Sequence, residues 1–343
     1  MSRPLLEVRD LTLRYQTMQG SLTAVDSVSF SLDRGQSLGL VGESGGGKTS
    51  LGLALMKLLP ENSKLTGGRI LLDGVDLFHL DENQMRPYRW NRISMVFQAA
   101  MNSLDPVYKV GEQIAEAIEA HQSVSHHQAM STVGDLFDLI GLDRNFMNRY
   151  PHEYSGGMKQ RAVIAMALSC EPDLVIADEP TTALDVISQD RILRQLRLLQ
   201  KQLNMAMIYV THDIGVVAEV TDYVGVMYAG QLVELGKTSE VLSSPRHPYT
   251  AALMSSFPSV TGEKKELVVL EGEPPDLTVE SEGCRFADRC AHSTDMCRII
   301  QPTLVDHLGH RYACWNPQDG ALERPVTHRT ELPSGDVNGV PTR

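Results

Sequence analysis

The chain has 343 residues, of which 42% are hydrophobic and 22% are charged. At about 150 residues per domain, this length suits two domains or one large domain with an appendage. The ordinary balance of apolar and charged residues excludes disordered, collagen-like and fibrous proteins. The formal net charge of −12 argues against a surface built to bind nucleic acid, because that task needs clustered Lys and Arg. A negative net charge is still compatible with a local positive pocket that binds one nucleotide.

No apolar run reaches the roughly 18 to 20 residues that a membrane-spanning helix needs, and the most apolar stretch, 51–59, contains Lys57. The first residues, MSRPLLEVRD, lack the basic and apolar regions of a signal peptide. We therefore expect the chain to work in the reducing cytoplasm. In that compartment, thiols or metal ligands are the preferred interpretation of its five cysteines, ahead of disulfides.

The first part of the chain, to about residue 75, alternates between apolar and polar side chains and predicts a mostly antiparallel β region. Three continuous apolar runs differ from it, because each is too short for a helix and is followed at once by polar residues. These runs are 37–41, 174–177 and 207–210. Such runs are typical of parallel strands that are covered on both faces and carry chemistry at their carboxyl ends.

Two stretches between these runs, 110–120 and 129–140, show helical spacing of apolar residues and predict an inserted helical subdomain. Beyond about residue 242, prolines punctuate the chain, and four of the five cysteines cluster between Cys284 and Cys314. The predicted division is a main domain over 1–240 with its helical subdomain at about 99–165, a C-terminal extension over 241–316 and a mobile tail over 317–343.

A glycine-rich segment after the first apolar run fits the phosphate-loop pattern G-x-x-x-x-G-K-S/T. Its members are Gly42, Glu43, Ser44, Gly45, Gly46, Gly47, Lys48 and Thr49. In such a loop, backbone N–H groups surround the phosphates, Lys48 reaches the β and γ oxygens, and the Thr49 hydroxyl holds Mg²⁺. A merely flexible turn is the alternative. The strand before the loop and the apolar helical segment after it favour phosphate binding.

A pair of carboxylates, Asp178 and Glu179, ends the second apolar run. Neighbouring residues on a strand point in opposite directions, so Asp178 can face Mg²⁺ while Glu179 faces an attacking water. Alone, an acidic strand end is more often a solvated one. Downstream of a phosphate loop, it predicts a site of phosphoryl transfer.

Residues 154–161 read YSGGMKQR and resemble the signature motif of the ATP-binding subunits of ABC transporters. Gln98 after a short apolar run, the Ala-Leu-Asp turn at 183–185 and Thr-His-Asp at 211–213 also resemble motifs of that family, in the family's order. The chain is identified as a member of it over residues 1 to about 240. The resemblance implies an α/β fold: a P-loop ABC ATPase core with an N-terminal antiparallel β region and an inserted helical subdomain, plus a small cysteine-ligated C-terminal domain.

The same resemblance implies roles for single residues. Tyr15 would stack on adenine, although a core aromatic is the alternative. Gln98 would meet Mg²⁺ and the lytic water, and Glu179 would be the general base. His212 would contact the γ-phosphate, with a plain surface histidine as the alternative. Further residues implied in nucleotide binding are Ser155, Gly156, Gly157, Gln160, Asp178 and Asp185.

The signature turn also implies a second chain. Ser155, Gly156 and Gly157 form an anion site at a helix start that lacks a lysine, so in this family they act on ATP held mainly by a partner subunit. Two positions depart from the family pattern: Gly46 stands where serine is frequent, and Tyr154 where leucine is usual. Backbone groups make most phosphate contacts, so neither change should abolish binding.

Three surface segments resemble the peptide-importer group of the family: 98–114, 151–153 and 244–250. This implies an ATP-hydrolysing subunit at the cytoplasmic face of the cell membrane, which powers uptake of peptides or related small solutes. Its implied partners are a second, non-identical ATPase chain, two membrane permease subunits and an external solute-binding protein. The alternative is a non-transport ABC ATPase acting on ribosomes, DNA or cluster assembly. Such proteins usually carry two cassettes or a long coiled coil, and neither is visible here.

Four cysteines, Cys284, Cys290, Cys297 and Cys314, have gaps of five, six and sixteen residues. From spacing alone, four soft thiolates favour an iron–sulfur cluster or Zn²⁺, and the Cys-x-x-Cys knuckles of many structural zinc sites are absent. Residues 283–290 resemble the C-terminal extension of peptide-importer ATPases, which favours a 4Fe–4S cluster over zinc, with unligated thiols as a third outcome. Cys170 stands apart as a small core residue.

Overall fold

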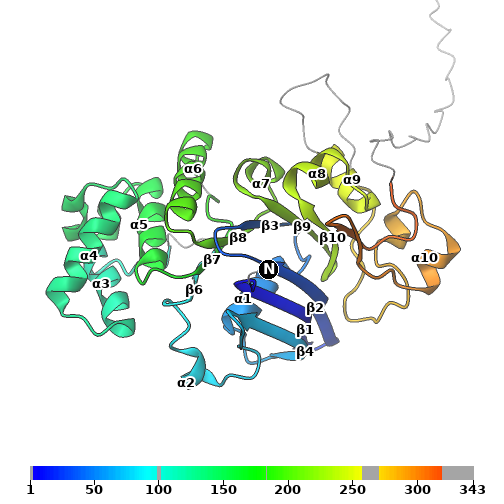
Figure 1. Cartoon of the computed structure of the whole chain (residues 1–343), viewed down its shortest axis with the longest axis horizontal. Helices are drawn as coiled ribbons and strands as arrows, with labels where there is room; N and C mark the ends of the chain where they lie inside the picture. The colour runs from blue at the N-terminus through cyan, green and yellow to red at the C-terminus, as the bar shows by residue number, and fades with distance from the viewer. Residues whose placement is uncertain (1–2, 99–101, 183, 257–269, 319–343) are drawn as a thin grey trace, which may run out of the picture.

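The computed structural model describes residues 3–98, 102–182, 184–256 and 270–318. The start of the predicted helical subdomain at 99–101, Ala183 of the aspartate turn and the predicted tail from 319 onward lie outside these residues. Figure 1 shows a central block of sheets and helices, with a lobe of helices at one end and the C-terminal segment at the other.

An antiparallel sheet is built from the N-terminal region. Its spatial order is β2-β1-β4-β5. The strands are β1 (Leu6–Thr17), β2 (Gly20–Leu32), β4 (Ser63–Leu72) and β5 (Val75–Asp76). Val8 of β1 pairs with Phe30 on one side and Ile70 on the other, and all three side chains are buried. The alternation therefore places one face of the sheet on the core, and the predicted antiparallel region is confirmed.

An eight-stranded sheet has the order β11-β12-β10-β9-β3-β8-β7-β6. Its strands are β3 (Ser37–Val41), β6 (Ile93–Val96), β7 (Leu174–Asp178), β8 (Ala206–Val210), β9 (Tyr223–Tyr228), β10 (Gln231–Lys237), β11 (Val305–His307) and β12 (His310–Tyr312). The strands from β9 to β6 are parallel. Every residue of β3, β7 and β8 is buried, as continuous apolar runs predict for strands with both faces covered.

Helices cover this sheet and extend from it. Those beside the sheet are α1 (Lys48–Met56), α2 (Glu82–Met85), α6 (Val186–Gln202), α7 (Ile214–Val220), α8 (Thr238–Ser243) and α9 (Pro248–Ser255). The helical lobe consists of α3 (Val110–His121), α4 (His126–Leu139), α5 (Gly156–Leu168) and the 3₁₀ turns Arg144–Asn148 and Pro151–Glu153. In the described part of the chain, no helix is both long enough and apolar enough to span a membrane.

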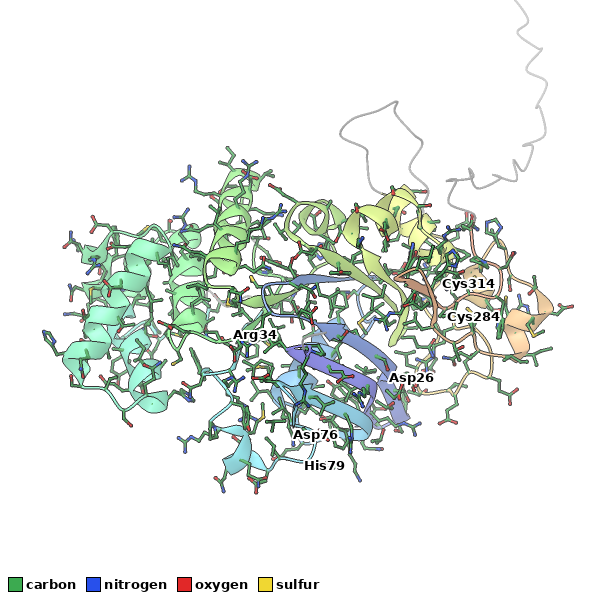
Figure 2. The ribbon with its side chains drawn as sticks, in the orientation of Figure 1. Asp26, Arg34, Asp76, His79, Cys284 and Cys314 are labelled. Atoms are coloured by element: carbon green, nitrogen blue, oxygen red, sulfur yellow. The ribbon has the colours of Figure 1, made fainter. Side chains whose placement is uncertain are left out.

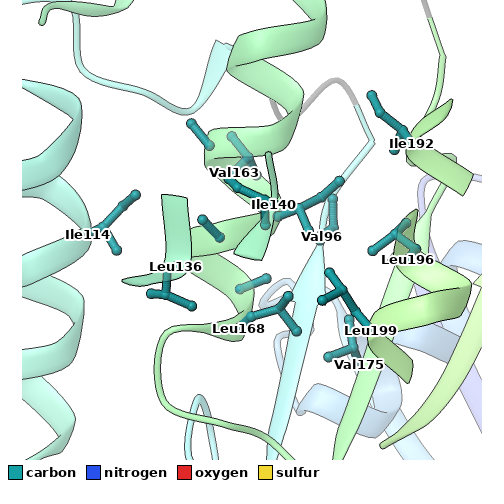
Figure 3. Close-up of a cluster of buried hydrophobic side chains, with 14 of the residues drawn as sticks. Val96, Ile114, Leu136, Ile140, Val163, Leu168, Val175, Ile192, Leu196 and Leu199 are labelled. Atoms are coloured by element: carbon teal, nitrogen blue, oxygen red, sulfur yellow. The ribbon is translucent and has the colours of Figure 1, made fainter. Parts of the chain in front are cut away.

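One apolar core joins the helical lobe to the sheet. Figure 3 shows Ile114 and Leu136 of the lobe facing Leu168 of α5, with Val96, Val175 and Leu199 on the sheet side. These side chains are between 0 and 7% exposed. Because α5 belongs to the same core as β6 and β7, the signature motif is attached firmly to the strands that carry the predicted catalytic residues.

The C-terminal segment is joined to the eight-stranded sheet. It contributes β11, β12, a 3₁₀ turn (Ala287–Arg289) and α10 (Asp295–Ile299), and β12 pairs with β10 at Glu234 and Tyr312. The Glu234 carboxylate is fully buried, accepts hydrogen bonds from the N–H groups of Arg246 and His247, and lies 2.6 Å from Nε2 of His310. Burial of this carboxylate is tolerated because all its partners are in place.

His247 gives the stability of the fold a pH dependence. Its side chain caps α9 by accepting a hydrogen bond from the N–H of Tyr249, and burial lowers its pKa from 6.5 to about 4. The unfolded chain then binds the proton more readily, so stability falls as the pH drops from about 6.5 to about 4. His247→Asn keeps a capping oxygen but does not titrate. Between pH 6.5 and pH 4, we expect the free energy of unfolding of this variant to fall by up to about 3 kcal/mol less than that of the unmodified chain. Urea unfolding at a series of pH values measures the difference, and equal slopes for the two chains would contradict it.

Candidate functional site

The predicted phosphate loop connects β3 to α1, with Gly47 directly before the helix. Gly42 and Gly47 have φ angles of 147° and 94°. A Cβ at Gly42 would lie 2.0 Å from the carbonyl oxygen of Met227, and one at Gly47 would lie 2.2 Å from that of Ala24. Neighbouring backbone therefore leaves room only for glycine at both positions, and the loop is held in its curve from outside.

Lys48 and Asp178 lie at the base of this loop. The Lys48 ammonium donates hydrogen bonds to the carbonyl oxygens of Gly42 (2.7 Å) and Glu43 (2.8 Å). Burial lowers the pKa of Lys48, and the charges of Glu179, Asp178 and Glu43 act against that shift. Asp178 is 1% exposed and accepts a hydrogen bond from the Thr49 hydroxyl at 3.3 Å. Burial raises the pKa of Asp178. A buried carboxylate beside a hydroxyl is an oxygen pair that suits Mg²⁺.

Three side chains converge on Glu179, the residue after β7. One of its oxygens accepts hydrogen bonds from the Gln98 amide and the Thr182 hydroxyl, both at 2.9 Å. The other lies 2.9 Å from Nδ1 of His212. Burial alone would raise the pKa of Glu179, but the hydrogen bonds from His212 and Thr182 lower it overall. The carboxylate is thus kept ionised and oriented, as a group that polarises a water must be.

The backbone at Glu179 is held in an uncommon conformation. Its φ is 46°, in the left-handed region, and its N–H donates to the carbonyl oxygen of Val210 at the end of β8. Such a conformation persists only where the surroundings enforce it. Thr182 was not among the sequence candidates; its place three residues after Glu179, in the turn that leaves β7, is the signal that could have found it.

The structure places the remaining candidates apart from this group. The Tyr15 hydroxyl lies 3.2 Å from the Ser50 hydroxyl in α1, and its ring packs partly against the core, so its place suits both alternatives of the sequence analysis. Gln160 is 3% exposed within α5. Asp185 caps α6, accepting hydrogen bonds from the N–H and hydroxyl of Ser188.

The signature motif opens α5. Ser155 is the capping residue and accepts a hydrogen bond from the N–H of Met158, so Gly156 and Gly157 form the first turn. Ser155 and Gly157 line a hollow of about 330 Å³, into which Arg161 and Arg191 also reach. Asp143 lines the same hollow, so its charged lining of two arginines and one aspartate is positive overall and, beside a helix start, suits an anion. In Figure 1, α5 belongs to the helical lobe and α1 to the central block.

All four C-terminal cysteines line one small hollow, together with His247. Figure 2 shows Cys284 and Cys314 close together in this segment. Backbone N–H groups point at three of the sulfurs; the one from Asn316 lies 3.3 Å from Sγ of Cys314. Burial raises the pKa of Cys290 to about 11 and that of Cys314 to about 12, and the neighbouring cysteines add to both shifts.

The metal assignment of the sequence analysis is not supported by this arrangement. Within the described ranges, no group of three or more His, Cys, Asp or Glu side chains is placed so that it could hold a metal ion. The four thiols share a hollow, but sharing it does not make them a metal site. The 4Fe–4S cluster and its zinc alternative therefore stay predictions.

Comparisons with known proteins agree with the fold and the site. Residues 25–182 match the sequence model of the family described as "ABC transporter", and residues 233–297 match "Oligopeptide/dipeptide transporter, C-terminal region". The dimeric structure of the ATP-binding cassette MJ0796 in a post-hydrolysis state with ADP and Pi is similar, with a TM-score of 0.61 and 25% identity. It covers 68% of this chain and 98% of that one. The chain thus has the fold of an ATP-binding cassette.

Curated relatives narrow the class. The oligopeptide transport ATP-binding protein OppD of Bacillus subtilis is 46% identical over 335 residues, covering 96% of this chain and 94% of the relative. The probable peptide ABC transporter ATP-binding protein y4tR of Sinorhizobium fredii is 44% identical over 320 residues, covering 92% and 96%. The chain belongs to the ATP-binding proteins of the oligopeptide/dipeptide ABC transporters. These relatives favour the importer over the non-transport ATPase.

Glu179→Gln tests the convergent group. It keeps the shape of the side chain but removes the charge that would polarise water. We expect the affinity for ATP·Mg to stay within about twofold and ATP hydrolysis by the assembled transporter to fall by at least about 100-fold. Equilibrium binding and steady-state phosphate release measure the two effects. The exposed Glu61→Gln is the control, and undiminished turnover by Glu179→Gln would refute the role.

Proposed function

We propose that the chain binds and hydrolyses ATP with Mg²⁺ and so powers the uptake of peptides or related small solutes by a membrane transporter. The observation that carries this proposal is the convergence of Gln98, Thr182 and His212 on Glu179, next to the buried pair of Lys48 and Asp178. These groups come from four parts of the chain. Together they supply a phosphate cradle, a pair of metal ligands and an oriented carboxylate, which are the parts that phosphoryl transfer to water needs.

Within this site, the chain's own residues divide the work. Lys48 would exchange its carbonyl partners for the phosphate oxygens, and Thr49 and Asp178 would hold Mg²⁺, which when bound would neutralise charge on the phosphates. Glu179 would accept a hydrogen bond from the attacking water, Gln98 would help to place that water and to hold the metal, and His212 would contact the γ-phosphate. Tyr15 stacks on the adenine.

The complete site needs a second ATPase chain. Ser155 and Gly157 present an anion-binding helix start beside Arg161 and Arg191. This helix start belongs to the helical lobe, whereas the phosphate loop of the same chain belongs to the central block. ATP held by one chain's loop is closed over by the other chain's signature. The dimeric state of the MJ0796 structure supports this arrangement, and we propose a non-identical second subunit.

Transport follows through membrane partners. The relatives are transport ATP-binding proteins, and we propose that this chain docks at the cytoplasmic face of two permease subunits that are served by an external solute-binding protein. Closure of the ATPase pair then moves the permeases, and hydrolysis reopens it.

Copurification with the transporter's other subunits tests this function. In membranes or nanodiscs, we expect the assembled complex to hydrolyse ATP several times faster when the solute-binding protein carries a peptide than when it is empty. Lys48→Ala serves as the matched inactive complex. Association with ribosomes or nucleic acid instead of permeases, with turnover indifferent to peptide, would overturn the proposal.

The four cysteines are proposed to bind a 4Fe–4S cluster. What supports this proposal is that all four sulfurs line one hollow and that backbone N–H groups point at three of them, as such groups do at the sulfur ligands of clusters. When bound, the cluster would supply covalent bridges among these loops.

Cys290→Ser tests the cluster. Protein purified without oxygen is expected to contain iron and to absorb at about 400 nm, and Cys290→Ser should lose both. Cys170→Ser should keep them, because Cys170 lies in the apolar core near α3 and does not line the hollow. Stoichiometric zinc, or four free thiols, in the unmodified protein would contradict the assignment.

A further inference from the structure

An arginine from the C-terminal segment reaches the phosphate loop. The two terminal nitrogens of Arg289 donate to the two carboxylate oxygens of Glu43, at 2.8 and 2.9 Å. The Arg289 side chain is only 6% exposed, and its Nε donates to the carbonyl oxygen of Glu271. The Glu43 side chain is 28% exposed, and a two-point pair of this kind fixes both partners in orientation as well as in distance.

The surroundings of the pair are aromatic. The guanidinium of Arg289 also contacts the Tyr228 hydroxyl at 3.2 Å and lies 5.7 Å from the Tyr228 ring and 6.0 Å from that of Phe286. The Tyr249 hydroxyl accepts a hydrogen bond from the Glu43 N–H at 2.9 Å. Residues beyond β9 therefore hold both the carboxylate and the backbone of Glu43, while Lys48 holds its carbonyl oxygen.

A neighbouring arginine strengthens this attachment. Arg285 pairs with Asp26 of β2 and donates to the carbonyl oxygen of Ala229, in the turn between β9 and β10. The next residue in that turn, Gly230, donates its N–H to the Gly46 carbonyl oxygen at 3.1 Å. Two arginines of one short segment thus anchor the loop itself and the turn beneath it. Figure 2 shows Asp26 on the β-sheet and Cys284, which precedes Arg285, in the C-terminal segment.

We propose that Arg289 is a positioning residue of the nucleotide site, through which the C-terminal segment raises the affinity of the phosphate loop for ATP·Mg. The inference rests on the proposed ATP binding. Arg289 acts in two ways. It holds the outer side of the loop, and it cancels the charge of Glu43, which would otherwise repel the triphosphate from within the loop that must bind it.

The test is equilibrium binding of ATP·Mg to the full-length chain. Arg289→Gln leaves Glu43 charged and unpaired, and we expect its Kd to rise about tenfold, within the usual range for coupling between sites. Arg289→Lys keeps the positive charge but cannot form the two-point pair with Glu43, so its Kd for ATP·Mg should lie between those of the unmodified chain and Arg289→Gln. Glu43→Gln combined with Arg289→Gln removes the stranded charge and should recover much of the affinity.

Arg298→Gln is the matched control. Arg298 is an arginine of the same segment, also next to a cysteine, but it is exposed and its pair with Asp288 lies on the surface. Its variant should bind ATP·Mg like the unmodified chain. In the assembled transporter, Arg289→Gln should raise the KM for ATP and leave kcat nearly unchanged, a split that a loss of folded protein would not produce.

The inference and the proposed function fail in different ways. A Kd for Arg289→Gln within twofold of the unmodified chain overturns the inference, provided that Lys48→Ala loses binding. If Lys48→Ala binds ATP normally, the proposed site itself is wrong. Should Arg289→Gln not fold, Arg289→Lys decides the question, and an unchanged Kd for it overturns the role of the two-point pair.

Discussion

The site depends on one constraint, the curve of the loop between β3 and α1. Its N–H groups must face inward to a triphosphate, so its outer side must be held by something else. Carbonyl oxygens of Ala24 and Met227 occupy the space that a side chain at Gly47 or Gly42 would need, and Gly230 donates to the loop's own backbone. The phosphate cradle is therefore shaped by β2 and the β9–β10 turn as much as by its own sequence.

The parallel strands β3, β7 and β8 then bring the other groups to the same edge. The adjacent carboxylates after the apolar run of β7 differ in environment. Asp178 is buried, which raises its pKa, and its carboxylate accepts a hydrogen bond from the Thr49 hydroxyl, whereas hydrogen bonds from His212 and Thr182 lower the pKa of Glu179. Two neighbouring residues of one type thus acquire separate tasks from their contacts.

The sequence predicted those features that depend on residues close together in the chain. The buried strands, the antiparallel region and the helices around 110–140 follow from hydrophobic period, and the phosphate loop follows from its glycines. The pair of Arg289 and Glu43 could not be predicted, because its members are 246 positions apart and no periodicity links them. The same holds for the pairing of β12 with β10. Thr182 was missed because a threonine in a turn carries little signal of its own, and the arrangement of the four sulfurs depends on loops that spacing does not define.

The attachment of β12 has a consequence for any shortened version of this protein. If the chain stopped after β10, the backbone of that strand would become an open sheet margin, able to pair with another molecule. Glu234 would also lose His310 and the N–H groups of Arg246 and His247, which are the partners that make burial of its carboxylate tolerable. A chain cut after β10 would thus tend to self-associate, because β12 would no longer cover the free edge of that strand.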